Sequence, residues 1–184
     1  MLTSDQRTQL LTIARDAVAA AVAGEPLPKL SVDDEALCAA CGAFVTLKSG
    51  DRLRGCIGQF VAKAPLWQTV QQMARAAATE DPRFLADRIQ PSEVDRLSID
   101  ISILSPLERT REPLSLELGK HGIYVKRGGR AGCFLPQVAT ETGWSKEEFL
   151  GHCCAGKAGL DPDAWCDPQT EVYLFTAEVI EDSR

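Results

Sequence analysis

The chain has 184 residues, of which 45% are hydrophobic, which is enough for one domain of ordinary size with its own core. Its formal net charge of −6 at pH 7 provides no general attraction to phosphate backbones or anionic lipids, which disfavours nucleic acids and membrane surfaces as partners. No apolar run reaches the roughly 20 residues that span a bilayer, and residues 1–15 lack a basic segment followed by an apolar one, so we expect a cytoplasmic protein.

The seven cysteines are an odd number, and without a secretion signal we expect them to be reduced rather than paired in a disulfide scaffold. Cys38 and Cys41 have the spacing of a zinc or redox pair, but a closed zinc site needs four ligands and no second such pair accompanies them. The alternative is that both line a helix. Cys153 and Cys154 are adjacent, so on a helix they face different directions. We therefore expect no metal ion and no cofactor.

The first part of the chain predicts helices followed by a hairpin. Residues 3–23 carry apolar side chains at helical spacing after a Thr3 or Ser4 cap, and Ser31 is positioned to cap a short helix that ends at Gly42. Residues 43–48 and the segment from Leu53 onward predict two strands joined by a turn at 49–52. Pro65 suits the first turn of a helix that runs to about Thr79.

The second part predicts further strands joined mainly by hairpins. The strict alternation of residues 97–104 predicts a strand with one buried face, and Leu114, Leu116 and Leu118 alternate again. Residues 123–126 and 131–135 flank a Gly-Gly turn, residues 145–155 predict a helix capped by Ser145, and residues 171–180 predict a final strand. Helices and antiparallel strands without a βαβ rhythm predict an α+β fold: an antiparallel sheet flanked by helices.

The strand that contains Cys56 has an unusual composition. Gly55 and Gly58 weaken a strand, so their presence indicates that a ligand or another backbone lies close to it. Alternation places Arg54, Cys56 and Gly58 on one face, where the guanidinium would favour the reactive thiolate. The alternative is that Cys56 is a small buried hydrophobic residue, as most free cysteines are.

Two polar segments are further candidates for a functional site. Glu80, Asp81 and Arg83 follow the helix that ends near Thr79, either as a solvated helix end with a local ion pair or as functional groups. Lys120 and His121 lie in a turn framed by glycines, where the histidine is either a hydrogen-bonded structural residue or part of a site that something approaches closely.

Several separated motifs together resemble the AMMECR domain family, and the resemblance covers nearly the whole chain. They are Phe44-Val45-Thr46-Leu47, Leu53-Arg54-Gly55-Cys56-Ile57-Gly58, Asp81-Pro82-Arg83-Phe84, Gly119-Lys120-His121-Gly122, Leu135-Pro136-Gln137-Val138, Trp144, Glu148-Phe149-Leu150 and Lys157-Ala158-Gly159-Leu160. Cys133 and Gln59 depart from residues common in the family. The resemblance implies a single two-lobed α+β domain over residues 1–184, with a larger lobe from the N- and C-terminal segments and a smaller inserted lobe.

Among bacterial and archaeal proteins the chain is similar to the A component of the AmmeMemoRadiSam system, which implies a Memo-like protein and a radical SAM enzyme as partners. The family's signature residues present here are Arg54, Gly55, Cys56, Gly58, Asp81, Arg83, Lys120, His121, Pro136 and Gln137. The resemblance implies no settled reaction.

Three functions compete at this stage. In the first, Cys56 is a nucleophile acting on a peptide or acyl-like substrate, with His121 as base or cationic group and Asp81 or Glu80 orienting that base. Gln137 and backbone N–H groups would stabilise a developing oxyanion. Arg54, Gly55, Gly58, Arg83 and Lys120 would then bind substrate in the same cleft. In the second, the cleft is a non-catalytic docking site for a substrate or protein. The third, RNA binding through Lys120, Lys126, Arg127 and Arg130, is opposed by the acidic net charge.

Overall fold

The computed structural model describes residues 1–61 and 64–182, and the chain divides into two compact units. Unit 1 contains Met1–Leu104 together with Glu178–Arg184, and unit 2 is the intervening segment Ser105–Ala177. Each unit has its own hydrophobic core and its own four-stranded sheet. Helices and antiparallel strands confirm the predicted α+β fold.

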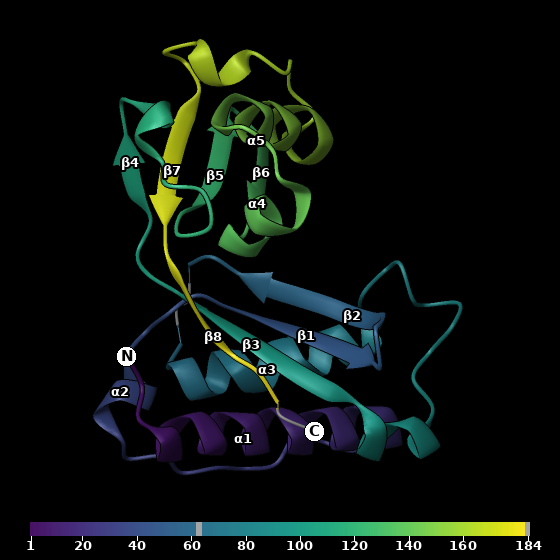
Figure 1. Ribbon diagram of the computed structural model, residues 1–184. Coiled ribbons are helices and arrows are strands. Elements are labelled where there is room, and N and C mark those ends of the chain that lie inside the picture. The colour runs from purple at the N-terminus through teal and green to yellow at the C-terminus, as the bar shows by residue number, and fades with distance from the viewer. Residues whose placement is uncertain (62–63, 183–184) are drawn as a thin grey trace. The chain divides into compact units, whose positions relative to one another are not determined.

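The sheet of unit 1 has the strand order β2-β1-β3-β8, which places β2 at one edge (Figure 1). Its strands are β1 (Ala43–Ser49), β2 (Arg52–Gln59), β3 (Ser98–Leu104) and β8 (Ala177–Ile180). β1 pairs antiparallel with both β2 and β3, as the hairpin and the alternating segment predict.

Two long helices cover one face of this sheet (Figure 1). α1 (Ser4–Ala23) begins at Thr3, whose hydroxyl accepts from the N–H of Gln6, and ends at Gly24 in the left-handed conformation. α3 (Leu66–Thr79) begins after Pro65. Their apolar stripes meet the inward side chains of β1 and β3 in one core, whose members include Leu10, Leu37, Val45, Leu47, Val70, Ile99 and Ile101.

The short second helix begins later than the sequence predicts. α2 (Glu35–Cys38) is capped by Asp34, whose carboxylate accepts from the Leu37 N–H at 3.1 Å, so Ser31 is not the cap. The side-chain amide of Gln6 also donates to this carboxylate, which lowers the pKa of Asp34. The Asp34 carboxylate accepts hydrogen bonds from both the Leu37 N–H and the Gln6 amide, so it fixes this end of the helix more firmly than the hydroxyl of Ser31, three residues earlier, would.

The sheet of unit 2 has the order β4-β7-β5-β6, and each neighbouring pair is antiparallel. Its strands are β4 (Glu108–Thr110), β5 (Gly122–Arg127), β6 (Arg130–Phe134) and β7 (Glu171–Phe175). Its helices are α4 (Pro136–Thr142) and α5 (Lys146–Cys153), the latter capped by Ser145 as predicted and continued by a π-helical turn, Cys154–Ala158. The Phe149 and Leu150 side chains of α5 are fully buried in the core of unit 2.

Two strand predictions are wrong in detail. The segment 171–180 is not one strand: it breaks at Thr176, whose N–H and C=O bond Ser105, so β7 and β8 belong to different sheets. The alternation around Leu116 is not a strand either, because Pro113 starts a 3₁₀ turn, Pro113–Ser115, and only Leu116 of the three leucines is buried. The edge strand β4 lies earlier, in the charged segment that follows Pro106.

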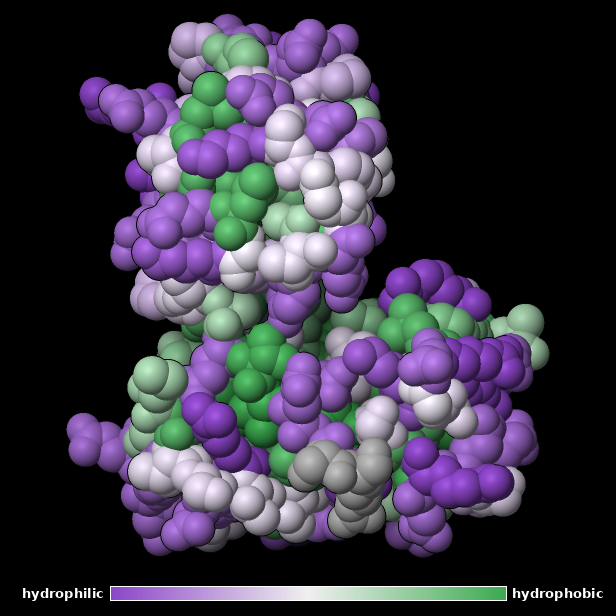
Figure 2. Space-filling view, viewed as in Figure 1, coloured by the Kyte–Doolittle hydropathy of each residue, from purple (hydrophilic) through white to green (hydrophobic). Residues whose placement is uncertain are grey.

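Hydrophilic residues intermix with smaller groups of hydrophobic ones on the face shown in Figure 2. None of the helices in the described part of the chain is both long enough and apolar enough to cross a membrane.

Candidate functional site

Cys56 lies half-buried in the middle of the edge strand β2, directly opposite Thr46 of β1. The Thr46 hydroxyl is within hydrogen-bonding distance of the sulfur, with Oγ1 and Sγ 3.2 Å apart. A hydroxyl that donates to sulfur stabilises negative charge on it. The thiol is therefore neither fully exposed nor enclosed in an apolar core.

Asp81 and Arg83 bind the backbone of Cys56 from outside the sheet. The Cys56 N–H donates to Asp81 Oδ2 at 2.9 Å, and Arg83 Nη2 lies 3.4 Å from the Cys56 carbonyl oxygen. The two side chains are also joined to each other, since Arg83 donates from Nε to Oδ1 at 3.0 Å and from Nη2 to Oδ2 at 2.7 Å. The arrangement is a bidentate ion pair that closes over the strand edge at the thiol.

The electrostatics of this pair keep both groups charged. The hydrogen bond from Arg83 is the main cause that lowers the pKa of Asp81 to about 2, and the backbone N–H of Cys56 adds to it. The same bond raises the pKa of Arg83, with smaller contributions from the charges of Asp81 and Cys56. Asp81 is 2% exposed, whereas the Arg83 side chain is 55% exposed. Asp81 thus holds the thiol strand, and both of its oxygens accept hydrogen bonds from Arg83 or from the Cys56 backbone.

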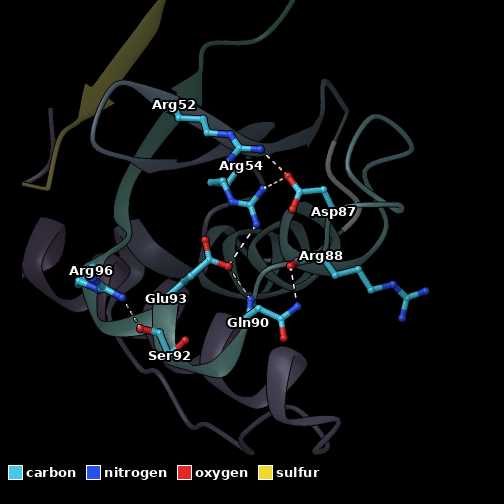
Figure 3. Close-up of polar contacts among 8 residues, drawn as sticks. All are labelled: Arg52, Arg54, Asp87, Arg88, Gln90, Ser92, Glu93 and Arg96. Carbon is cyan, nitrogen blue, oxygen red and sulfur yellow. Dashed lines mark hydrogen bonds and ion pairs between the residues drawn. The ribbon is translucent and has the colours of Figure 1, made fainter.

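Arg54 does not lie beside the thiol as alternation predicts. The pairing register shifts between Leu47 and Lys48, so Arg54 is the extra residue of a β-bulge and alternation fails there. Its guanidinium is buried, 2% exposed, and pairs with Asp87 at 2.8 Å and Glu93 at 3.2 Å (Figure 3). Arg83, which lies 3.4 Å from the Cys56 carbonyl oxygen, is a cation close to Cys56.

The two glycines are explained by packing within the protein. A Cβ at Gly55 would lie 2.0 Å from the carbonyl oxygen of Ala77, because the backbone of α3 passes there. A Cβ at Gly58 would lie 2.2 Å from Cγ of Phe44, whose ring covers that position. Close approach is therefore correct as a reason for the glycines, but α3 and Phe44, not a ligand, fill the space beside them.

His121 and Lys120 lie in unit 2, and both are engaged with Glu117. The Glu117 N–H donates to Nδ1 of His121 at 3.0 Å, and the Lys120 ammonium lies 2.7 Å from the Glu117 carboxylate, which is the main cause of that carboxyl's lowered pKa. An Nδ1 that accepts a hydrogen bond leaves the proton of a neutral imidazole on Nε2. His121 therefore presents a donor rather than a base.

A pocket of about 480 Å³ includes His121 in its lining. Charged and hydroxyl side chains also face it, together with Phe175; they include Glu108, Arg109, Thr110, Ser105 and Ser115. Gln137 follows Pro136 at the start of α4, and its Oε1 is buried without a hydrogen-bond partner among the residues described.

Sequence reasoning missed Thr46 of the thiol site and the two carboxylates that bind Arg54. Thr46 could have been found by pairing the strands of the predicted hairpin, since it is the cross-strand neighbour of Cys56. The partners of Arg54 are Asp87, in a loop, and Glu93, in a 3₁₀ turn (Pro91–Arg96). Both lie more than 30 residues away in the chain, and no sequence pattern links them to Arg54.

Within the described ranges, no group of three or more His, Cys, Asp or Glu side chains is arranged to hold a metal ion. Cys38 ends α2 and its thiol donates to the Val32 carbonyl, while Cys153 and Cys154 are buried, which raises the pKa of each.

Comparison with known proteins gives consistent results along the chain. The family model AMMECR1 matches residues 11–180. Protein NEQ441 of Nanoarchaeum equitans is 41% identical over 180 residues, covering 94% of this chain and 98% of the relative, and Protein MK0488 of Methanopyrus kandleri is 46% identical over 151 residues, covering 78% and 72%.

The crystal structure of the uncharacterized protein PH0010 from Pyrococcus horikoshii superposes with a TM-score of 0.85 at 36% identity, covering 95% of this chain and 90% of that one. The matched range includes both Cys56 of unit 1 and His121 of unit 2. Sequence motifs, fold and relatives agree, and the chain belongs to the AMMECR1 family.

Proposed function

We propose that the protein is a cysteine-dependent component that performs covalent chemistry on a peptide or acyl-like substrate, with Cys56 as nucleophile. The observation that carries this is the setting of the thiol: half-buried, opposite the Thr46 hydroxyl, on a backbone held by the Asp81–Arg83 pair. Arg83 gives this partly exposed thiol an electropositive setting, the kind in which reactive cysteines are found.

The proposed step is acyl transfer to sulfur. The Cys56 thiol releases its proton to water and the sulfur attacks the substrate carbonyl carbon, so that a C–S bond forms. The bond to the leaving amine or alcohol then breaks as that group takes up a proton from water, which leaves an acyl thioester on Cys56. Arg83, with most of its side chain accessible, is placed to bind an anionic part of the substrate. Asp81 is a positioning residue, because both of its oxygens are committed to hydrogen bonds.

His121 enters the proposal as a hydrogen-bond donor through Nε2, with Lys120 and Gln137 as further binding groups of unit 2. That these residues act on the same substrate as Cys56 stays a prediction. The test compares His121→Phe, Cys56→Ser and the double variant. Residues that serve one reaction make His121→Phe slower on its own, while the double variant is no slower than Cys56→Ser alone.

We also propose a Memo-like protein and a radical SAM enzyme as partners in a reducing, cytoplasmic compartment. The partners are implied by the resemblance of the motifs, and the seven free cysteines fit a reducing compartment. Co-purification of the tagged chain with both proteins from its own cell would support this. Sedimentation of the three mixed proteins as separate species at micromolar concentration would contradict it.

A simple ester tests the proposed chemistry. The protein is incubated with phenyl acetate, and acetylation of each cysteine is measured by peptide mass spectrometry. We expect acetyl thioester at Cys56 to form faster than at Cys38 or Cys166, which are more exposed. Cys56→Ser removes that product while Cys166→Ser does not. Acetylation that follows exposure alone would overturn the nucleophile and leave a non-catalytic binding module.

A further inference from the structure

The backbone hydrogen bonds of β2 reveal which of its residues face the edge of the sheet. In an antiparallel pair, residues alternate between those that bond the neighbouring strand and those whose N–H and C=O point away from it. The Cys56 N–H goes to Asp81, so the pair Cys56 and Thr46 is of the second kind. The close approach of their side chains, 3.2 Å between Sγ and Oγ1, agrees with this.

By the same alternation, the next such pair is Gly58 and Phe44. The N–H and C=O of Gly58 therefore point away from β1, towards the open edge. Outside the pairing of β2 with β1, neither group forms a hydrogen bond with any residue that the structure describes, and Gly58 is only half-buried. At Cys56 the outward N–H and C=O groups are bound by Asp81 and Arg83. The outward groups of Gly58, two residues further along β2, have no such cover.

The surroundings of Gly58 suit an extended peptide. The residue has no side chain, and the Phe44 ring lies against it and contacts the Phe60 ring with centroids 5.1 Å apart. A peptide strand could thus reach the backbone and rest a side chain against two aromatic rings. Beside this position Arg83 keeps its Nη1 group free of hydrogen bonds to described residues, which gives a site for a carboxylate.

We propose that an extended peptide with an acidic group adds to the edge of β2 at Gly58, adjacent to the Cys56 thiol. Peptide binding at this edge does not depend on the proposed reaction of Cys56. Only the statement that the bound peptide is a substrate rests on the proposed function. Main-chain pairing gives affinity with little dependence on sequence, while Arg83 selects for the acidic group. The closed position at Cys56 keeps the peptide backbone from covering the thiol.

Amide hydrogen exchange tests the proposal without any chemistry if Cys56→Ser protein is used. In the free protein we expect rapid exchange at Gly58 and slow exchange at Ile57, which bonds β1, and at position 56, which donates to the buried Asp81. The probes are peptides of about six alternating Thr and Val residues that end in Glu. Each is also made in two N-methylated forms: one methylated at the alternate residues whose N–H groups would face β2, and one at the residues whose N–H groups would face away.

Saturating peptide should slow exchange at Gly58 by about tenfold or more, and N-methylation of the pairing edge should abolish this. Arg83→Gln should reduce the preference for a terminal Glu over a terminal Gln. Four results would each overturn the proposal. Two concern the free protein: slow exchange at Gly58, or a dimer paired through Gly58. The other two concern the peptides: no protection by any of them, or equal protection by both methylated forms.

These outcomes are separate from those of the acetylation test. Protection at Gly58 without acetylation of Cys56 would keep the peptide site and remove the reaction. Acetylation without protection would keep the nucleophile and remove strand addition.

Discussion

The carboxylate of Asp81 accepts a hydrogen bond from the backbone N–H of Cys56 at 2.9 Å, although the two residues are 25 positions apart in the chain. The bond ties the segment after α3 to the edge of the sheet at the thiol. Arg83 completes the connection by bonding both that carboxylate and the Cys56 carbonyl. The ion pair that the sequence shows only as a charged helix end is therefore part of the thiol's immediate environment.

The Asp81→Asn variant should lower the free energy of unfolding by about 1–3 kcal/mol, because it removes the charge that a bidentate arginine and a backbone N–H both bind. Chemical denaturation measures this change. Glu80→Gln is the control: Glu80 is 55% exposed and pairs with Arg75, which is itself 54% exposed, so its loss should cost less than about 1 kcal/mol. Equal effects of the two variants would contradict the structural role of Asp81.

The low pKa of Asp81 makes its contribution to stability dependent on pH. Its pKa is about 2 in the folded protein and 3.8 in the unfolded reference, so the stabilisation is complete above the unfolded value and is lost as pH falls towards 2. The difference in unfolding free energy between the parent protein and Asp81→Asn should therefore be constant above about pH 5 and shrink below about pH 4. A difference that grows as the pH falls through this range would show the opposite sign.

Arg54→Met should destabilise the protein by about 1–3 kcal/mol, since it leaves the carboxylates of Asp87 and Glu93 without their buried partner. Arg52→Met is the matched control, because Arg52 bonds the same Asp87 but is 67% exposed, and its loss should cost less than about 1 kcal/mol. Both variants should label at Cys56 as the parent does. A slower reaction of Cys56 in a folded Arg54→Met protein would show that Arg54 does contribute to the reactivity of the thiol.

Gly55→Ala should destabilise the protein by about 1–3 kcal/mol or more, because the new Cβ would collide with the Ala77 carbonyl of α3. Gly129→Ala adds the same methyl group at a turn position with no atom within 4 Å and should be close to neutral. Thermal unfolding of the two variants compares them directly. A neutral Gly55→Ala would mean that α3 does not pack against this strand.

Local patterns were sufficient to predict much of the fold. The caps of α1 and α5, the two hairpins and the strand Ser98–Leu104 follow from residues close in sequence, and the structure confirms them. The division of residues 171–180 between two sheets could not be predicted, because its apolar alternation continues through Thr176, and only the bonds to Ser105 interrupt the strand.

The candidate site was predictable in its residue types but not in its partners. Arg54 was placed beside Cys56 because alternation assumes an unbroken ladder, and a one-residue bulge leaves no mark in the sequence. The partners of Arg54 and of the Cys56 backbone come from segments distant in the chain, so the roles of Asp81 and Arg83 became visible only through their hydrogen bonds.

Alkylation of the cysteines in the folded protein tests the central claim, that Arg83 and Thr46 make Cys56 a reactive thiol. Iodoacetamide labelling is followed at each cysteine by peptide mass spectrometry, with the exposed Cys38 and Cys166 as internal references. We expect Cys56 to react about tenfold faster than either reference despite being less exposed, and Arg83→Gln to remove that advantage. Labelling of Cys56 at or below the rates of Cys38 and Cys166, unchanged by Arg83→Gln, would contradict the account.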